Sequence, residues 1–348
     1  MNMTTTPITA LRPVPDLPDF EQLQTVLRRG KPDRPTLFEF FLNDRLYRRL
    51  AGLPEQARVT PFVVAEAFRR AGYDYVTFLP PGLSFPQREH ARLATHSLNE
   101  GGMISDRASF EAYPWPDPDQ ADYDWIEALG RALPSGMRIV IHGPGGVLEN
   151  AVAIVGFETL CCLLADDPEL ASEVFAAIGS RLLRFYERCL EYPAVGAIIG
   201  NDDWGFKTQP MLSPMDLRRY VFPWHRQIVA AAHAAGRPAI LHSCGNAKEI
   251  MDDIIDDLRY DAKHSYEDAI QPVEEAYDQY GARIAVLGGI DVDFVIRSPP
   301  DAVYTRAVRM LERAETRGGY ALGTGNSVPA YVPDEQYFAL IRAALDRR

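Results

Sequence analysis

A histidine and a cysteine, His242 and Cys244, stand two residues apart directly after the apolar run 238–240. Side chains alternate between the two faces of a strand, so residues two apart point the same way. Imidazole nitrogen and thiolate sulfur are typical zinc ligands, and a catalytic zinc site needs three protein ligands. The spacing therefore indicates two ligands of a metal site at the end of a strand.

Strand-like and helix-like segments alternate along the chain, and this order is typical of a parallel α/β fold. Amphipathic helices are expected between short apolar runs, for example over 167–192, where apolar residues recur at intervals of three and four. The eight runs expected to form strands are 36–41, 73–78, 137–142, 195–201, 238–242, 260–264, 283–288 and 319–323. Eight such units predict a (β/α)8 TIM barrel, with a doubly wound open sheet as the alternative.

The domain organisation follows from the same pattern. Residues 1–30 are expected to be an N-terminal leader, and 31–348 a single barrel. The segment 79–135, after the second predicted strand, is too long for a plain connection. We interpret it as an insertion that forms a lid or pocket wall, although a subunit contact is also possible.

Ionisable and polar residues collect where the predicted strands end. In a TIM barrel the active site lies at the carboxyl ends of the strands, so these side chains are expected to converge. Besides His242 and Cys244, the candidates are Glu39, Asn201, Asp203, Trp204, His264, Tyr266, Glu267, Asp291 and Asn326. Each also has a structural interpretation: a helix cap for Asp203, a tight turn for Asp291, a core position for the aromatic residues.

The sequence predicts different roles for the carboxylates of Glu39 and Asp202. Glu39 lies between apolar residues in the middle of a predicted strand, and a buried carboxylate must be paired, protonated or bound to a metal. We favour a functional role for it. Asp202, next to Asp203, is expected to face the other way and to be structural.

Bulk composition excludes several classes of function. The chain has 348 residues and a formal net charge of -12, which argues against nucleic acid or an anionic membrane as a partner. No apolar run reaches the length of a membrane span. Four irregularly spaced cysteines fit a reducing cytoplasm, and Cys161, Cys162 and Cys189 are expected to lie in the core.

Several motifs resemble the uroporphyrinogen decarboxylase-like superfamily, and they look closest to its cobalamin-dependent methyltransferase branch. They cover most of the chain from about residue 36 onward. The motifs are His242-Ser243-Cys244-Gly245-Asn246, Gly288-Gly289-Ile290-Asp291, Gly323-Thr324-Gly325-Asn326-Ser327, Asp202-Asp203-Trp204-Gly205 with Ser213-Pro214, and Val332-Pro333.

The resemblance implies a TIM barrel in which His242 and Cys244 bind zinc. The family often has a second cysteine where this chain has Thr324, so the third ligand must come from elsewhere, with Glu39 as first candidate and Asp203 as second. The Arg-rich signature of true uroporphyrinogen decarboxylases is replaced by the acidic and aromatic run 39–45. A polyanionic substrate is therefore not expected.

The leading hypothesis from the sequence is zinc-dependent methyl transfer between a small methylated substrate (O-, N- or S-methyl) and a corrinoid protein. Asp203 is expected to orient substrate or donate a proton, with His264 and Glu267 as further catalytic or supporting residues. Asn201, Trp204, Tyr266, Asp291 and Asn326 are the candidate substrate-binding residues. The alternatives are a metal-independent decarboxylase or lyase that uses Asp203 and His242, and a non-catalytic small-molecule-binding barrel.

Overall fold

Seven parallel strands form one curled sheet in the computed structural model, which describes residues 17–87, 98–99 and 102–348. Each strand pairs with the next in chain order. The strands are β1 (Tyr75–Phe78), β2 (Arg138–His142), β3 (Val195–Asn201), β4 (Ala239–His242), β5 (Ala262–His264), β6 (Ala285–Leu287) and β7 (Tyr320–Ala321). Their residues are almost all buried, as expected for strands covered by helices. The prediction of a parallel α/β fold is confirmed.

The first predicted strand, 36–41, is not a regular strand in the structure. Only single bridges join Leu37 to Leu322 and Leu42 to Val328, next to β7. On the other side, the hydroxyl group of Tyr75 in β1 accepts a hydrogen bond from the amide of Glu39 (2.7 Å) and donates one to its carbonyl (2.6 Å). A side chain thus satisfies the backbone groups that a strand ladder would use, so the described sheet has seven strands and an extended segment lies between β7 and β1.

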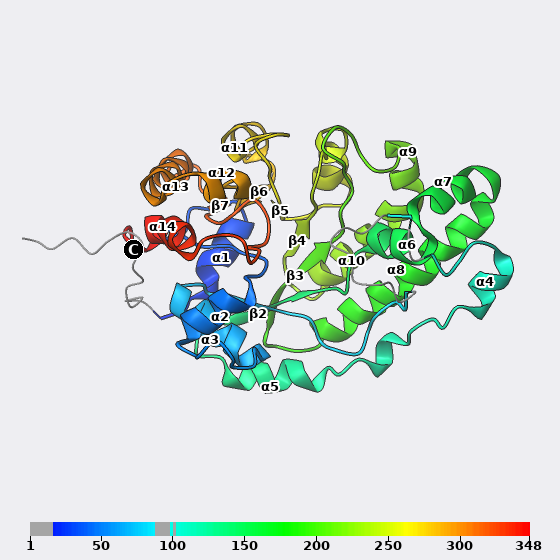
Figure 1. Ribbon diagram of the computed structural model, residues 1–348, viewed down its shortest axis with the longest axis horizontal. Helices are drawn as coiled ribbons and strands as arrows, with labels where there is room; N and C mark the ends of the chain where they lie inside the picture. Colours follow the sequence, from blue (N-terminus) through cyan, green and yellow to red (C-terminus); the bar gives the residue numbers. More distant parts are fainter. Residues whose placement is uncertain (1–16, 88–97, 100–101) are drawn as a thin grey trace, which may run out of the picture.

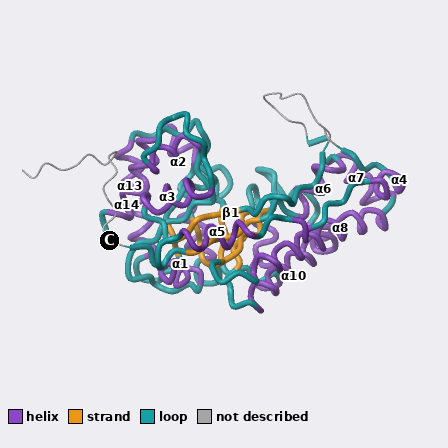
Figure 2. The backbone as a smooth tube through the Cα atoms, turned by 90° about the horizontal axis from the view of Figure 1, so that it is seen from below, coloured by secondary structure: helices purple, strands orange, loops and turns teal. Residues whose placement is uncertain are grey.

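Helices follow or precede the strands and surround the sheet (Figures 1 and 2). Their starts carry the expected caps: for example, Ser213 accepts a hydrogen bond from the amide of Asp216, and Asp167 accepts one from Leu170. The longer predicted helix, 167–192, is confirmed as α8. The α-helices are α1 (Phe20–Leu27), α2 (Asp44–Ala51), α3 (Pro61–Ala71), α4 (Arg107–Ala112), α5 (Asp124–Ala132), α6 (Val147–Val155), α7 (Phe157–Asp166), α8 (Pro168–Leu190), α9 (Pro214–Asp216), α10 (Phe222–Ala234), α11 (Val273–Tyr280), α12 (Val292–Arg297), α13 (Pro300–Ala314) and α14 (Asp334–Leu345).

Helices α4, α6, α7 and the far part of α8 extend away from the sheet, at the right of Figures 1 and 2. The described part of the connection between β1 and β2 packs along α8. Arg107 pairs with Glu173 at 2.5 Å, and Asp119 accepts from both Arg184 and Arg188 at 2.9 Å. Residues 88–97 and 100–101 of the predicted 79–135 insertion, and 1–16 of the predicted leader, lie outside the described residues.

None of the described helices is by itself long and apolar enough to cross a membrane. Helices α6 and α7, which are bent by 98° relative to each other, have together the length and composition of a span.

Cys189 is buried in α8 as predicted. The prediction for Cys161 and Cys162 is wrong, because both are exposed on α7. Two adjacent positions of that helix face solvent while its buried contacts are made by Leu160 and Leu163.

Candidate metal centre

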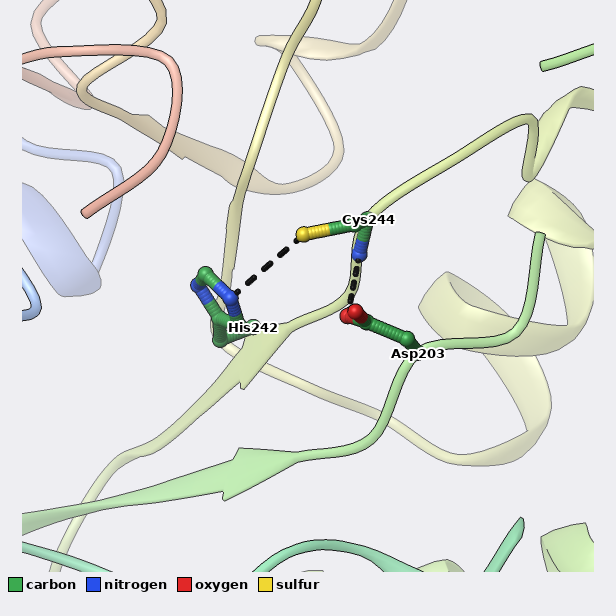
Figure 3. A group of neighbouring side chains, drawn as sticks. All are labelled: Asp203, His242 and Cys244. Atoms are coloured by element: carbon green, nitrogen blue, oxygen red, sulfur yellow. Dashed lines mark hydrogen bonds between the residues drawn. The ribbon is translucent and has the colours of Figure 1, made fainter. Parts of the chain in front are cut away.

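Three potential metal ligands meet at the carboxyl edge of the sheet: Asp203, His242 and Cys244 (Figure 3). One carboxylate oxygen, one imidazole nitrogen and the thiol sulfur lie within 4.8 Å of one another. His242 ends β4, Cys244 lies two residues further on, and Asp203 follows β3. The same-face placement expected for His242 and Cys244 is present, since the Cys244 Sγ is 3.7 Å from His242 Nε2.

The two loops that carry Asp203 and Cys244 are held against each other by glycines. Gly245 has a φ of +81°, and a Cβ on it would lie 1.9 Å from the carbonyl oxygen of Gly205. Only glycine fits such a close approach at a positive φ. The contact brings Cys244 beside Asp203, whose carboxylate accepts a hydrogen bond from the Cys244 amide at 2.7 Å.

A chain of hydrogen bonds fixes which nitrogen of His242 is free. His264 Nε2 lies 3.1 Å from the carbonyl oxygen of Thr324 and donates to it, because a carbonyl can only accept. In the neutral imidazole of His264, Nδ1 is then an acceptor, and it receives the proton of His242 Nδ1 at 2.8 Å. The unprotonated Nε2 of His242 is therefore the nitrogen that faces Cys244, as a metal ligand must be.

The environment keeps both histidines neutral. Burial lowers the pKa of His264 to about 3 and, together with the neighbouring His264 and Lys263, lowers that of His242 well below its usual value. Burial also raises the pKa of Cys244 to about 12, with the Asp203 charge adding to the effect, and raises the pKa of Asp203. A bound divalent cation would reverse the last two shifts, because it stabilises thiolate and carboxylate.

Two further side chains complete the surroundings of the ligands. Asn326 donates a hydrogen bond from Nδ2 to the Cys244 sulfur at 3.3 Å, a contact that favours the thiolate form. The ring of Phe40 packs against His242 (centroids 4.6 Å apart) and His142 (5.0 Å). The ligands thus lie against apolar surface on one side and a hydrogen-bond donor on the other.

The hydrogen bonds of His264 make it a candidate positioning residue for this site, and its replacement by phenylalanine tests that role. The ring keeps its contact with Phe38 (5.2 Å), but His242 Nδ1 loses its acceptor. We expect zinc affinity, measured by competition with a chelator, to fall about 10- to 100-fold. His233→Gln serves as the control, because His233 lies in the last turn of α10 and pairs with Asp261 at 2.8 Å. An unchanged affinity in His264→Phe would contradict the tautomer argument.

Glu39, ranked first among the carboxylate ligands from the sequence, does not join this group. Phe38 and Phe40 face His264 and His242, so Glu39, between them, points to the opposite face. There it is fully buried and accepts a hydrogen bond from the Thr324 amide at 2.7 Å, with its other oxygen 2.7 Å from the Thr324 hydroxyl group.

Burial keeps Glu39 protonated at neutral pH, because it raises the pKa of the carboxyl group to about 8. The Thr324 hydroxyl group lies 2.7 Å from Glu39 Oε2 and also contacts the carbonyl of Asn326, which can only accept. A neutral carboxyl group can donate to the hydroxyl group, which leaves the hydroxyl proton for that carbonyl. A protonated Glu39 holds the loop that carries Asn326.

Glu39→Gln is expected to stabilise the protein at alkaline pH. As pH rises from the ordinary value of 4.5 to about 8, the unfolded state loses a proton that the folded state keeps, so wild-type stability falls. Glutamine reproduces the neutral hydrogen bonds without this loss. The free energy of unfolding of the variant, from denaturant titrations at pH 4 and pH 8, should exceed that of wild type at pH 8 by several kcal/mol, at about 1.4 kcal/mol per pKa unit. An equal difference at both pH values would show that Glu39 is ionised.

Some of the remaining candidate residues line a cavity at the carboxyl edge of the sheet, and the others make structural contacts. Asn201 accepts from the amide of Gly143 at 3.0 Å, and Asp291 caps α12 and accepts from Asp268. Trp204 has no exposed surface and packs against the rings of Phe222 and His225. Tyr266 and Glu267 line a cavity that also contains Asn326.

Asp202 is structural, as predicted. It is fully buried, its carboxylate accepts from the Leu148 and Glu149 amides at the start of α6, and it contacts His225 Nε2 at 2.9 Å. These contacts hold Asp202 in place, and with it the chain between the end of β3 and Asp203.

Two charged residues near the ligands were not among the candidates. Lys263, buried in β5, donates to the carbonyls of Ser265 (2.7 Å) and Ser243 (3.3 Å). A lysine within a strand predicted to be part of the buried sheet was a signal that could have been used. Glu149, at the start of α6, has its pKa raised to about 8 by burial and by the carboxylates of Asp202 and Asp203. No local pattern indicated that it would lie near Asp203.

A curled parallel sheet with converging ligand atoms at its carboxyl edge is typical of the α/β-barrel enzymes. The family model described as Uroporphyrinogen decarboxylase (URO-D) matches residues 103–346, well over half of the chain. The chain therefore belongs to the uroporphyrinogen decarboxylase family. It is also 27% identical over 141 residues to a uroporphyrinogen decarboxylase from Chloroflexus aggregans, a match that spans 37% of this chain and 36% of that protein.

Solved structures agree on the fold. A methyltransferase from Methanosarcina mazei superposes with a TM-score of 0.73 at 16% identity, covering 94% of this chain and 98% of that one. A putative vitamin-B12 independent methionine synthase from Listeria monocytogenes gives a TM-score of 0.51 at 11% identity, covering 90% of this chain and 98% of that one. The predicted resemblance to the uroporphyrinogen decarboxylase-like superfamily is confirmed by the family model, and the solved structures show the same fold.

Proposed function

We propose that the protein is a zinc-dependent methyltransferase that moves a methyl group between a small methylated substrate and the corrinoid of a partner protein. The observation that carries the proposal is the convergence of Asp203, His242 and Cys244. One nitrogen, one sulfur and one oxygen ligand fit zinc and leave a fourth position for substrate. When bound, zinc would act as a Lewis acid on the heteroatom that carries the methyl group.

The residues of the chain have distinct roles in this proposal. The free Nε2 of His242, the thiolate of Cys244 and a carboxylate oxygen of Asp203 would hold the metal. His264 and Thr324 fix the His242 tautomer, and Asn326 stabilises the thiolate through its amide. Phe40 excludes water from one side of the imidazole. Tyr266 and Glu267 lie beside the path of the substrate.

The corrinoid carrier would dock over the carboxyl edge of the sheet, because the methyl group must reach the metal-bound heteroatom there. We propose that the chain from α1 onward, and not only 31–348, forms a single barrel unit, since Leu23, Val26 and Leu27 of α1 are buried in the core. We also propose that 79–135 contribute a wall to this surface. The ion pair of Arg107 with Glu173 supports the second point, since it ties part of that segment to the helical extension.

The alternative of a metal-independent decarboxylase is favoured by one observation. Glu149 lies near Asp203 with its pKa raised to about 8, so the site holds a carboxyl group that can donate a proton at neutral pH. The cluster of carboxylates, however, repels the polyanionic substrate that such a reaction would use.

Metal analysis together with methyl transfer tests the proposal. Protein purified without added zinc should contain close to one zinc per chain. It should also convert reduced cobalamin to methylcobalamin, followed by absorbance, with at least one member of a panel of methyl ethers, methylamines and thioethers. Protein that contains no metal and takes up none in dialysis against zinc would overturn the zinc site, and metal-independent CO2 release from carboxylated substrates would favour the decarboxylase.

A further inference from the structure

A cavity of about 540 Å³ opens beside the candidate metal centre, at the same edge of the sheet. Its walls come from the loops after β5 and β7, from α12 and from the extended segment before α2. Asn326 is shared, because it lines the cavity and donates to the Cys244 sulfur at 3.3 Å. A molecule in the cavity would therefore lie one side chain away from the proposed ligands.

Aromatic rings form much of this wall. Phe41 and Tyr331 line the cavity and are 43% and 70% exposed, so they present aromatic surface on the same wall. Tyr266 also lines it and is buried, and its hydroxyl group has no hydrogen-bond partner in the described part of the chain. A buried hydroxyl group without a partner is costly, so a polar ligand atom is expected near it.

The charge of the lining is entirely negative. Glu267 and Asp293 are its charged residues, and no lysine, arginine or histidine belongs to it. Asp293 is paired with Arg297 at 2.8 Å. Glu267 is half-buried, and its carboxylate makes no hydrogen bond or ion pair among the described residues. A half-buried carboxylate without a counter-ion attracts a cation.

Lys263 lies close enough to Glu267 to attract it electrostatically but forms no ion pair with it. Its Nζ lies over the ring of Tyr266, 4.5 Å from the centroid, but it is committed to the carbonyl oxygens of Ser243 and Ser265. It does not line the cavity. Three aromatic rings and an unpaired carboxylate are the combination that binds alkylated ammonium groups through cation–π attraction and charge.

We propose that the substrate carries a positively charged ammonium group, which this cavity binds through Glu267 and the rings of Phe41, Tyr266 and Tyr331. The inference rests on the proposed function, because it assigns the substrate class of the same site. The cavity recognises the ammonium group of the substrate. The methylated heteroatom, a few bonds away from that group, would extend past Asn326 to the metal.

Choline is a suitable probe, and 3,3-dimethylbutanol is its neutral isostere with carbon in place of nitrogen. Calorimetric titration of the full-length protein, both metal-free and zinc-loaded, should show choline binding and at least about tenfold weaker binding of the isostere. Glu267→Gln should weaken choline binding at least about tenfold and leave the isostere unchanged. Tyr331→Ala should weaken choline binding, whereas Tyr331→Phe, which keeps the ring, should not.

Asp293→Asn is the matched control, because its carboxylate lies in the same wall but is already paired, and it should change choline affinity by less than about threefold. Equal binding of choline and the isostere would overturn the proposal in favour of a neutral apolar substrate. Absence of choline binding to folded wild-type protein would also overturn it. Choline binding to a protein that takes up no zinc would instead contradict the proposed function and leave the cation site intact.

Discussion

Replacing Cys244 with alanine is expected to remove zinc from the protein and, with it, methyl transfer. Cys244 supplies the only sulfur among the three converging ligands, and its loss leaves one nitrogen and one oxygen. Loss of residues that merely support ligands already costs 10- to 100-fold in metal affinity, so loss of a ligand should cost more than about 100-fold. Zinc per chain, measured by mass spectrometry after dialysis, should fall from near one to near zero.

Cys162→Ala is the control for this variant. Its thiol group is exposed on α7 and takes no part in the site, so zinc content and methyl transfer should equal those of wild type. Thermal unfolding of both variants without zinc separates a lost ligand from a lost fold, since Cys244 is only half-buried. Full zinc content in a folded Cys244→Ala protein would show that the metal is held elsewhere.

The pairing of His242 with Cys244 could be predicted from the sequence because it depends on a local rule, the alternation of side chains along a strand. His264 was a candidate because it ends the next predicted strand, and the observed register places it beside His242. Asp203 was a candidate because it follows a strand. Its position beside Cys244 depends on the packing of Gly245 against Gly205, which no local pattern describes.

The orientation of Glu39 could not be predicted from its neighbours. Apolar residues flank it on both sides, so the sequence does not say which face of the segment points into the barrel. Two long-range contacts settle this: Phe38 against His264 and Phe40 against His242. The hydroxyl group of Tyr75 then takes the backbone groups of Glu39, so this segment does not form the eighth regular strand.

Thr324 stands where the resemblance led us to expect a second cysteine, and its contacts support the proposed ligands in another way. Its carbonyl fixes the tautomer of His264, and its amide and hydroxyl groups bind the protonated Glu39. The residue thus connects Glu39 and the imidazole pair as a support for the ligands. A threonine hydroxyl group that is fully buried and hydrogen-bonded in this way is not free to bind a metal.

The second large effect is expected on zinc affinity when Asp203, the proposed carboxylate ligand, is replaced by asparagine. Asp203→Asn keeps an oxygen that accepts from the Cys244 amide, so the loop geometry should persist, but it removes the negative charge that binds the metal. We expect zinc affinity to fall more than about 100-fold, since an amide oxygen is a much poorer zinc ligand than a carboxylate. Competition with a chelator at pH 7 measures the change.

Glu39→Gln is the matched comparison, because it makes the same chemical change at the other carboxyl group. Glu39 is already neutral and faces away from His242, so the variant should bind zinc within about threefold of wild type. Loss of zinc in Glu39→Gln with retention in Asp203→Asn would reverse the assignment and would require the segment before α2 to turn Glu39 toward the imidazole. Loss in both would mean that Glu39 acts on the site through Thr324, and the affinity of Thr324→Val would then fall in parallel.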